Sequence, residues 1–374
     1  MKPFPTKKAL GFGAMRLPLM SSGKTEDIDV QQVERMVDLA IANDCNYFDT
    51  AYPYHKEHSE MMLRETLVKR HPRNTFLLAD KMPCYLVKTT EDYPRFFETQ
   101  RERCGVDYFD FYLLHNLSDI SYKKIHNTGG FDFIQKIKAE GHAKYVGFSF
   151  HDQPEVLENI LSDHPEVDFV QLQINYADME RPSIKSRECM EIANAHNIPI
   201  IVMEPLKGGA LANLDGEALS TLKANDPAST PAQWGLRFAA SCPGVFLVLS
   251  GMSNMEQLQE NLKTFDDFKP LTQEEYKVID QVQDIIDKAN AIPCTSCNYC
   301  VDDCPMKINI PKIFSILNMV QQFGNANFPT MHYQRSTHVY GKASDCISCG
   351  ACERHCPQHI KIIKNLKLAV EKFE

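Results

Sequence analysis

Two cysteine runs near the end of the chain place the strongest limit on what it can fold into. CTSCNYCVDDCP, from Cys294 to Pro305, follows the spacing C-x2-C-x2-C-x3-C-P, and CISCGACERHCP, from Cys346 to Pro357, repeats it in full. A C-x2-C pair alone suits zinc as well as iron. Two complete runs are typical of a region that holds two 4Fe-4S clusters, each on four cysteine thiolates.

The pairing of the cysteines is expected to cross between the runs. In two-cluster ferredoxins the fourth cysteine of each run binds the other cluster. One predicted ligand set is therefore Cys294, Cys297, Cys300 and Cys356. The other is Cys346, Cys349, Cys352 and Cys304. Residues 310–323 between the runs have a helical pattern, so we predict a mostly helical ferredoxin-like domain.

Charge supports this interpretation of the C-terminal part. The whole chain of 374 residues has a net charge of −9, which argues against a nucleic-acid partner. From Ala291 onward there are nine Lys and Arg against six Asp and Glu, which is +3, so the rest of the chain carries −12. An oxidised four-iron cluster on four thiolates carries roughly −2, so two clusters would offset this local excess.

The remaining composition indicates a protein of a reducing compartment. Five of the 13 cysteines lie outside the two runs and show no motif spacing, which argues against a disulfide framework. The first 16 residues contain no apolar signal segment, and no stretch approaches the run of about 20 apolar residues that spans a bilayer. We therefore expect a cytoplasmic protein without a membrane partner.

Residues 1–265 alternate short apolar runs with amphipathic segments. The predicted strands cover 10–15, 47–51, 75–81, 108–115, 143–150, 169–176, 198–205 and 244–251. Helical patterns between them include 29–42 and 58–70, and Pro154 and Pro231 stand where first helical turns would begin. Eight such units predict a (β/α)8 TIM barrel. A doubly wound sheet is the alternative, but GFGAMR at 11–16 lacks the third glycine of a dinucleotide fingerprint.

The chain is thus expected to be an α/β protein in three parts. Residues 1–270 would form the barrel, 271–290 a connecting helix, and 291–374 the ferredoxin-type domain with two 4Fe-4S clusters.

Four chemically unusual residues follow successive predicted strands. Asp49 ends the second strand, Tyr54 lies just past it, Lys81 ends the third, and His115 ends the fourth. Barrel enzymes place their chemistry at these carboxyl ends. A phenol is a poor acid at neutral pH unless a nearby cation lowers its pKa, which a lysine held by a carboxylate can do. The four residues therefore predict a proton-transfer site.

The barrel part resembles the aldo-keto reductase family, and the whole chain resembles its iron–sulfur branch. The resemblance covers about residues 9–265 and rests on FDTAYPY, HSE, LADK, YLLH, GFS and MEPLKGG. It implies NAD(P)H as cofactor and a small carbonyl or alcohol as substrate. It also implies catalytic roles for Asp49, Tyr54, Lys81 and His115, with Tyr54 as general acid or base and His115 orienting the carbonyl. His55 departs from the glycine that is usual after this tyrosine.

The same resemblance implies a set of residues that bind the cofactor. They are Gly13, Met15, Arg16, Ser149, Gln171, Met203, Leu206, Gly208, Gly209, Glu260 and Asn261. Met203 stands where many members stack an aromatic ring. Gly251 and Gln257 stand where NADP-preferring members carry a lysine and an arginine.

These patterns predict an oxidoreductase that transfers hydride between a nicotinamide and a carbonyl or alcohol. A one-electron protein partner, such as a ferredoxin or flavodoxin, is expected for the clusters. Two alternatives stay open at this point: a cofactor-sensing module with sensing or structural clusters, and a barrel that uses a flavin in place of nicotinamide.

Overall fold

The computed structural model describes residues 4–21, 24, 26–182, 184–266, 268–288, 292, 294, 298–302, 304–323, 327–356 and 358–374. The chain packs into two compact units, each described here by itself. The first comprises residues 1–179, 184–206 and 232–271, and the second comprises 180–183, 207–231 and 272–374. The predicted domain limits stay a prediction, because compact packing does not show which parts fold independently.

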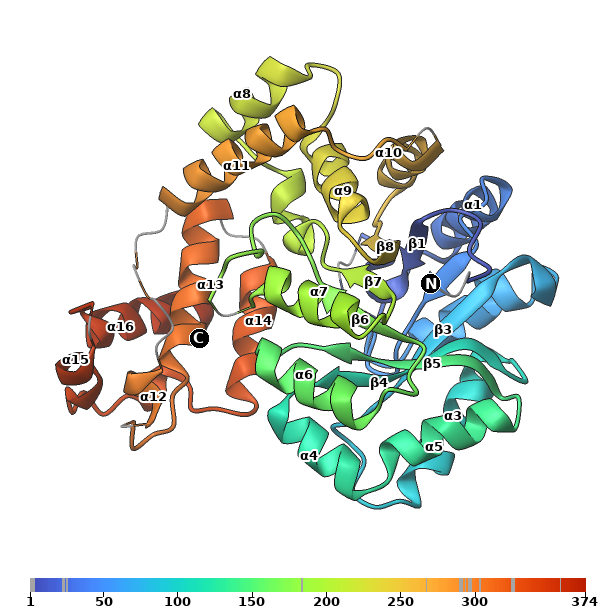
Figure 1. The fold of residues 1–374 in the computed structure, drawn as a ribbon, viewed down its shortest axis with the longest axis horizontal. Helices are drawn as coiled ribbons and strands as arrows, with labels where there is room; N and C mark the ends of the chain where they lie inside the picture. The colour runs from blue at the N-terminus through green and yellow to red at the C-terminus, as the bar shows by residue number, and fades with distance from the viewer. Residues whose placement is uncertain are drawn as a thin grey trace. The chain divides into compact units, whose positions relative to one another are not determined.

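The first unit is built on a closed barrel. In the described part of the chain, eight parallel strands pair in sequence order and the last pairs with the first (Figure 1). The strands are β1 Leu10–Gly13, β2 Tyr47–Asp49, β3 Leu77–Met82, β4 Phe109–Leu117, β5 Ala143–Phe150, β6 Phe169–Gln173, β7 Ile200–Met203 and β8 Val245–Gly251. The (β/α)8 prediction is therefore confirmed, with most strands slightly shorter than their apolar runs.

Helices connect the strands on the outside of the barrel (Figure 1). They are η1 Ala14–Arg16, α1 Val30–Ala42, α2 Ser59–Leu63, η2 Arg64–Val68, η3 Arg73–Thr75, α3 Asp92–Cys104, α4 Asp119–Asn127, α5 Gly130–Ala139, α6 Pro154–Asp163, α7 Ser186–Ala195, α9 Pro231–Ser241 and α10 Met255–Asp266. Local sequence sets several of their ends. The Asp29 side chain accepts a hydrogen bond from the Gln32 N–H and caps α1, and α6 begins at Pro154 as predicted.

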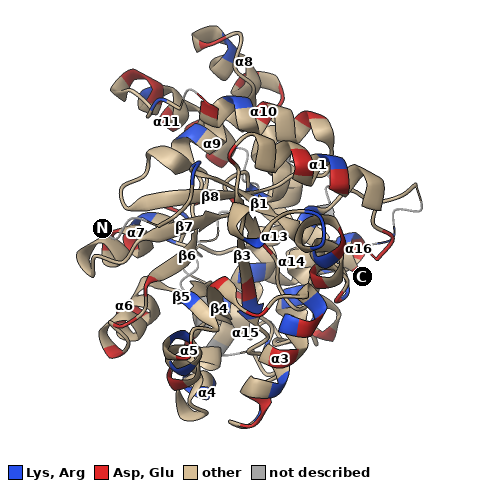
Figure 2. Ribbon diagram, turned by 90° about the vertical axis from the view of Figure 1, so that its right-hand side faces the viewer, with Lys and Arg blue, Asp and Glu red and all other residues tan. Residues whose placement is uncertain are grey.

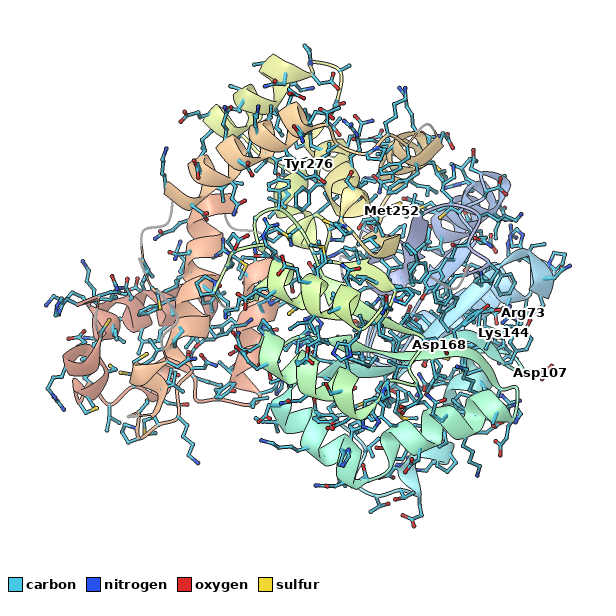
Figure 3. All side chains as sticks on the ribbon, viewed as in Figure 1. Arg73, Asp107, Lys144, Asp168, Met252 and Tyr276 are labelled. Atoms are coloured by element: carbon cyan, nitrogen blue, oxygen red, sulfur yellow. The ribbon has the colours of Figure 1, made fainter. Side chains whose placement is uncertain are left out.

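The amino-terminal end of the barrel is closed by packing and ion pairs. The ring of Phe4 stacks on Phe246 at 4.3 Å and lies edge-on to Tyr145 at 4.9 Å. Nearby, the buried Asp110 carboxylate accepts hydrogen bonds from Arg73 Nη2 at 2.6 Å and Lys144 Nζ at 2.9 Å. Figure 3 labels these two cations, Arg73 and Lys144. These groups stabilise the end of the barrel opposite to the strand ends that carry Asp49 and Lys81.

The second unit is helical in its described residues. Its elements are η4 Lys207–Ala212, α8 Gly216–Asn225, α11 Gln273–Lys288, α12 Tyr299–Asp302, α13 Ile310–Phe323, α14 Asn327–Thr337, η5 Ala343–Asp345, α15 Ala351–His355 and α16 Ile362–Phe373. The helix predicted over 310–323 is confirmed as α13. Apolar residues of α13 and α16, with those of α14, form one buried cluster that includes cysteines of both runs. In the described part of the chain, no helix is both long and apolar enough to cross a membrane.

Candidate active site and cysteine cavities

The predicted catalytic residues meet around the amine of Lys81. Lys81 Nζ donates hydrogen bonds to Asp49 Oδ1 at 2.5 Å and to the Thr50 carbonyl at 2.7 Å, and it lies 3.5 Å from Tyr54 Oη. Neighbouring parallel strands β2 and β3 bring these groups together at their carboxyl ends. The contact with Thr50 was not predicted from the sequence, because every residue has a backbone carbonyl and the residue type does not show which one accepts a hydrogen bond.

The charge on Lys81 depends on its neighbours. The side chain is 1% exposed. Burial alone lowers the pKa of Lys81, but the negative charge of Asp49, with Tyr54 and Asp80, raises it above its ordinary value. Burial raises the pKa of Asp49, and Lys81 and Gln171 oppose that shift. Lys81 therefore keeps its proton at neutral pH and places a cation beside the Tyr54 hydroxyl.

His115 completes the group from β4. Its ring lies nearly perpendicular to that of Tyr54, with 6.1 Å between ring centroids. Both side chains are partly exposed, whereas Asp49 and Lys81 are buried. The two residues predicted to touch the substrate are thus the two that remain accessible from outside.

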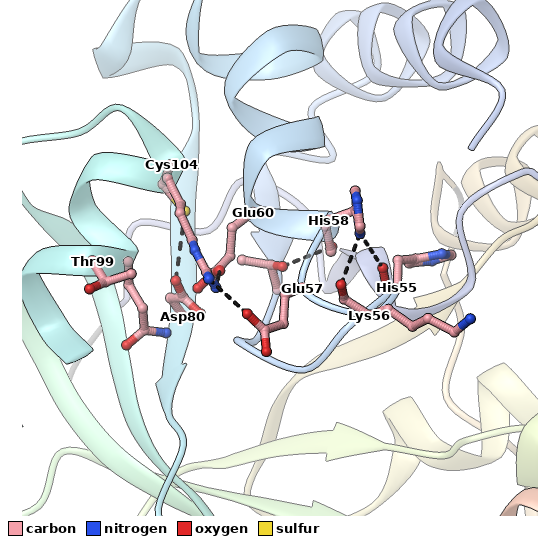
Figure 4. Close-up of polar contacts among 12 residues, drawn as sticks. His55, Lys56, Glu57, His58, Glu60, Asp80, Thr99 and Cys104 are labelled. Atoms are coloured by element: carbon pink, nitrogen blue, oxygen red, sulfur yellow. Dashed lines mark hydrogen bonds and ion pairs between the residues drawn. The ribbon is translucent and has the colours of Figure 1, made fainter. Parts of the chain in front are cut away.

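The segment after Tyr54 takes an unusual backbone path. His55, Lys56 and Glu57 are consecutive residues with positive φ, between 50° and 71°. His55 is 5% exposed, and its Nε2 accepts a hydrogen bond from the Leu17 backbone N–H at 3.1 Å. The backbone of this loop is also held by His58, whose Nδ1 is hydrogen-bonded to the carbonyls of His55 and Lys56 (Figure 4). The histidine therefore ties the segment after η1 to the loop of Tyr54.

A second buried polar group, which includes Glu60 and Asp80, lies next to Lys81. Glu60 and Asp80 are both fully buried, and Arg103 Nη1 donates to Glu60 Oε2 at 3.0 Å (Figure 4). Burial raises the pKa of Asp80 well above its ordinary value, and the nearby Glu60 raises it further. Protonation of Asp80 is therefore easier than that of an exposed aspartate. Its position next to Lys81 in LADK was the available sequence signal for this pair.

Two predicted cofactor residues stand beside the catalytic group. Ser149 and Gln171 are buried neighbours in the register of β5 and β6. Ser149 Oγ accepts a hydrogen bond from the Asn116 backbone N–H at 2.7 Å, and Asn116 directly follows His115. Gln171 lies next to Asp49 and lowers its pKa. Buried amide and hydroxyl groups at this end of the barrel fit the polar amide of a nicotinamide.

The other predicted cofactor residues of the first unit lie along the carboxyl ends of three strands. They are Gly13, Met15 and Arg16 at the end of β1 and in η1, Met203 and Leu206 at and after β7, and Glu260 and Asn261 on α10, which follows β8. Asn261 Nδ2 donates a hydrogen bond to Ser250 Oγ at 3.0 Å, so one of its donors is already engaged within the fold.

Gly251, the last residue of β8, lies against the side chain of Arg16, a cation from the other end of the barrel sequence. A Cβ atom on Gly251 would lie 3.1 Å from Cδ of Arg16, so the arginine side chain covers this glycine. Ser253 Oγ donates to the Arg16 carbonyl at 2.9 Å and holds the two segments together. Gln257 Oε1 accepts a hydrogen bond from the Ser253 N–H at 2.7 Å.

Gly208 and Gly209 belong to the second unit. Lys207, Gly208 and Gly209 have φ angles of 49°, 66° and 94°, a run of left-handed residues whose N–H groups suit an anion. A Cβ on Gly209 would meet nothing within 4 Å, which leaves the backbone open to a ligand. A Cβ on Gly208 would lie 2.0 Å from the ring of Phe328 on α14. The loop is therefore packed against a helix that lies between the two cysteine runs.

The cluster cysteines line two cavities of nearly equal size. The first, of about 320 Å³, is lined by Cys294, Cys300 and Cys356. The second, of about 330 Å³, is lined by Cys304, Cys346, Cys349 and Cys352. Each cavity takes cysteines from both runs, while Cys297 lies outside the described residues, and the crossed pairing stays a prediction.

The second cavity brings Cys304 close to the other run. Burial raises the pKa of the Cys352 thiol to about 11, and the nearby Cys346 and Cys304 add to the shift. In the described residues, no three His, Cys, Asp or Glu side chains group as ligands of a single metal ion. A four-iron cluster has a different requirement, because its four cysteines bind different irons. The cysteines in an otherwise mostly apolar lining, drawn from both runs, therefore fit such a cluster.

The chain belongs to the aldo/keto reductase family, whose model matches residues 9–284. A model of the 4Fe-4S dicluster domain matches residues 293–360. The chain is thus an oxidoreductase of this family that carries a ferredoxin-type region, and the resemblance inferred from the sequence is confirmed.

Among its relatives, an uncharacterized oxidoreductase of Schizosaccharomyces pombe is 27% identical, over 68% of this chain and 80% of the relative. A 9,11-endoperoxide prostaglandin H2 reductase of Trypanosoma cruzi is 26% identical, over 72% of this chain and 89% of the relative. An aldo-keto reductase from Klebsiella pneumoniae, solved in complex with NADPH, has a TM-score of 0.60 at 21% identity, covering 74% of this chain and 90% of that one. This last similarity supports the fold.

Proposed function

We propose that this protein transfers hydride between a nicotinamide cofactor and a small carbonyl or alcohol, and that its C-terminal region exchanges single electrons with a protein partner through two 4Fe-4S clusters. The observation that carries the first half is the position of Lys81, buried between the Asp49 carboxylate and the Tyr54 hydroxyl. The paired cysteine cavities support the second half.

Tyr54 is the proton donor in the direction of carbonyl reduction. A cation beside a phenol favours the ionised form, so Lys81 makes the Tyr54 proton easier to release. As the carbonyl carbon gains hydride, the bond between Tyr54 Oη and its proton breaks and the substrate oxygen takes the proton. In the reverse direction Tyr54 accepts the proton from the alcohol. Asp49 keeps Lys81 charged and in place throughout.

His115 is assigned to orienting the substrate carbonyl, since it is partly exposed and lies across from the Tyr54 ring. Ser149 and Gln171 are assigned to the nicotinamide amide. The left-handed run Lys207–Gly209 supplies N–H groups that suit a pyrophosphate. The nicotinamide itself supplies hydride chemistry, which moves two electrons at once.

The proposed division of the cysteines between two clusters is supported by the lining of the two cavities. Cys294, Cys300 and Cys356, with Cys297, would hold the first, and Cys304, Cys346, Cys349 and Cys352 the second. Such clusters supply one-electron chemistry. In the second cavity, the Ile308 N–H donates to Cys304 Sγ at 3.5 Å, a contact of the kind that tunes a cluster potential.

Equilibrium binding and turnover together test the hydride half. Anaerobically purified protein should bind NADH or NADPH, detected by nicotinamide fluorescence, and should oxidise the cofactor when small aldehydes or ketones are added. A flavin that co-purifies with the protein, with no binding of either nicotinamide, would contradict the proposal and favour the flavin alternative.

The preference between the two nicotinamides follows from Gly251 and Gln257. Neither carries a charge to pair with the 2′-phosphate, so we expect the Kd for NADPH to lie within about a hundredfold of that for NADH. Arg16 is the cation that covers Gly251. Replacing Arg16 by alanine should therefore weaken NADPH more than NADH. A wild-type preference for NADPH well beyond a hundredfold, unchanged in this variant, would show that other residues bind the phosphate.

A further inference from the structure

The described cysteines of the two cavities differ in how exposed they are. The first is lined by Ile310, Phe314 and Ile362, each 1% exposed, and its Cys300 is 7% exposed. The second is also lined by buried residues, including Ile308 and Leu366, and its Cys352 is likewise 7% exposed. Its Cys349, however, is exposed. A cluster in the second cavity would therefore have one ligand at the surface of the unit.

Large apolar side chains surround that exposed cysteine. Ile347 is 60% exposed and Met306 is 38% exposed, and both line the second cavity. Val339, at 66%, lies in the segment that ends at Gly341, which pairs with Ile308 and whose N–H donates to the Lys307 carbonyl. Single exposed apolar residues are common, but two beside one exposed cluster ligand indicate an interaction surface.

Three exposed cations belong to the segments that carry these apolar residues and Cys349. Lys307 follows Met306, and Lys342 follows Gly341, and both are exposed. Arg354 is also exposed, and its Nη1 donates to the Cys349 carbonyl at 3.3 Å. The lysines and arginines of α15 and α16 are marked in Figure 2.

Three acidic residues lie in the same region and are engaged by the backbone, one of them Glu374, which accepts a hydrogen bond from the Ser344 N–H at 3.1 Å. Asp345 accepts a hydrogen bond from the Lys342 N–H at 2.7 Å, and Glu353 accepts one from the Ile363 N–H at 2.9 Å. Positive and negative side chains are thus equal in number here, but the three carboxylates are hydrogen-bonded within the unit, whereas no ion pair in the described residues engages the exposed Lys307 or Lys342.

We propose that Met306, Ile347 and Cys349, bordered by Lys307, Lys342 and Arg354, form the docking surface for an acidic one-electron carrier protein. This inference rests on the proposed function of the clusters. The carrier gives up one electron and the cluster of the second cavity gains it, with no bond formed or broken. A small apolar contact with a charged border is typical of short-lived redox encounters, which need fast association more than a large interface.

The test compares two charge-reversed variants of the full, cluster-loaded protein. Lys307→Glu with Lys342→Glu changes the proposed surface without touching a cysteine. Lys361→Glu with Lys372→Glu makes the same charge change on exposed lysines of α16 and its amino-terminal cap. Each protein is mixed under anaerobic conditions with a reduced, acidic plant-type ferredoxin, and cluster reduction is followed by visible absorbance. Iron content and sedimentation are measured beforehand.

We expect the first variant to lose at least about tenfold in its second-order rate constant at low salt, and the control less than about threefold. The difference should shrink at high salt because the charges are screened. Reduction by the dicationic dye methyl viologen should not be slowed in either variant.

Equal rates with ferredoxin in both variants would overturn the docking surface. A change in oligomeric state caused by the first variant alone would also overturn it, and would assign the surface to a second copy of the chain. If neither ferredoxin nor the dye reduces wild-type clusters, the electron-transfer half of the proposed function fails instead.

Discussion

Replacing Tyr54 by phenylalanine is expected to lower the rate of carbonyl reduction roughly 10²–10⁴-fold, while leaving the Kd of the nicotinamide nearly unchanged. The substitution removes the proton that Lys81 activates and keeps the aromatic ring. Steady-state kinetics with a fixed aldehyde and a nicotinamide fluorescence titration measure the two quantities separately. Iron content should stay at the wild-type value, because the cluster cysteines lie in the other unit.

Tyr52 offers a matched control two residues away. Its ring lies under the guanidinium of Arg103, with 4.4 Å from Cζ to the ring centroid, rather than in the group around Lys81. Tyr52→Phe should therefore retain activity within a few fold. If the two variants lost the same activity, the assignment of the proton donor to Tyr54 would be wrong.

The second large effect concerns how the two clusters share the cysteines. Wild-type protein prepared without oxygen should contain about eight irons per chain, and Cys304→Ala should retain about four. Adding Cys352→Ala should remove no further iron, because both residues line the second cavity. Adding Cys300→Ala to Cys304→Ala should instead remove nearly all of it, because Cys300 lines the first cavity.

Ligation within each run predicts the reverse result for the two double variants. In that case the pair Cys300 and Cys304 would share a cluster and four irons would remain. Iron analysis and EPR of the reduced proteins distinguish the outcomes. Retained binding of nicotinamide by each variant shows that the barrel is still folded, so that loss of iron reports on ligation alone.

Much of the fold follows from patterns that are local in the sequence. A parallel strand buried on both faces needs a short continuous apolar run, and the eight predicted runs each overlap one of the eight barrel strands. Pro154 and Asp29 set helix starts by backbone geometry and by a side-chain cap, which depend only on nearby residues. The cysteine spacing likewise defines a cluster region without any knowledge of packing.

The candidate site was predictable in part for the same reason. Asp49, Lys81 and His115 lie at strand ends, and in a closed parallel barrel all strand ends of one kind lie on one face. Their meeting thus follows from topology once the barrel is inferred. Thr50 and the pair Glu60 and Asp80 were missed, because a carbonyl contact and the proximity of two buried carboxyl groups depend on distances between segments rather than on residue type.

The sequence alone determined the family, the barrel and the ferredoxin-type region, and it predicted the cysteine ligands as a set and the catalytic group. Only the tertiary structure placed Arg16 over Gly251, packed Phe328 on the Gly208 loop, and exposed Cys349 while Cys300 is buried. These features join residues far apart in the chain. Their distances and exposure are set by how whole segments pack, and short-range patterns carry no information about that.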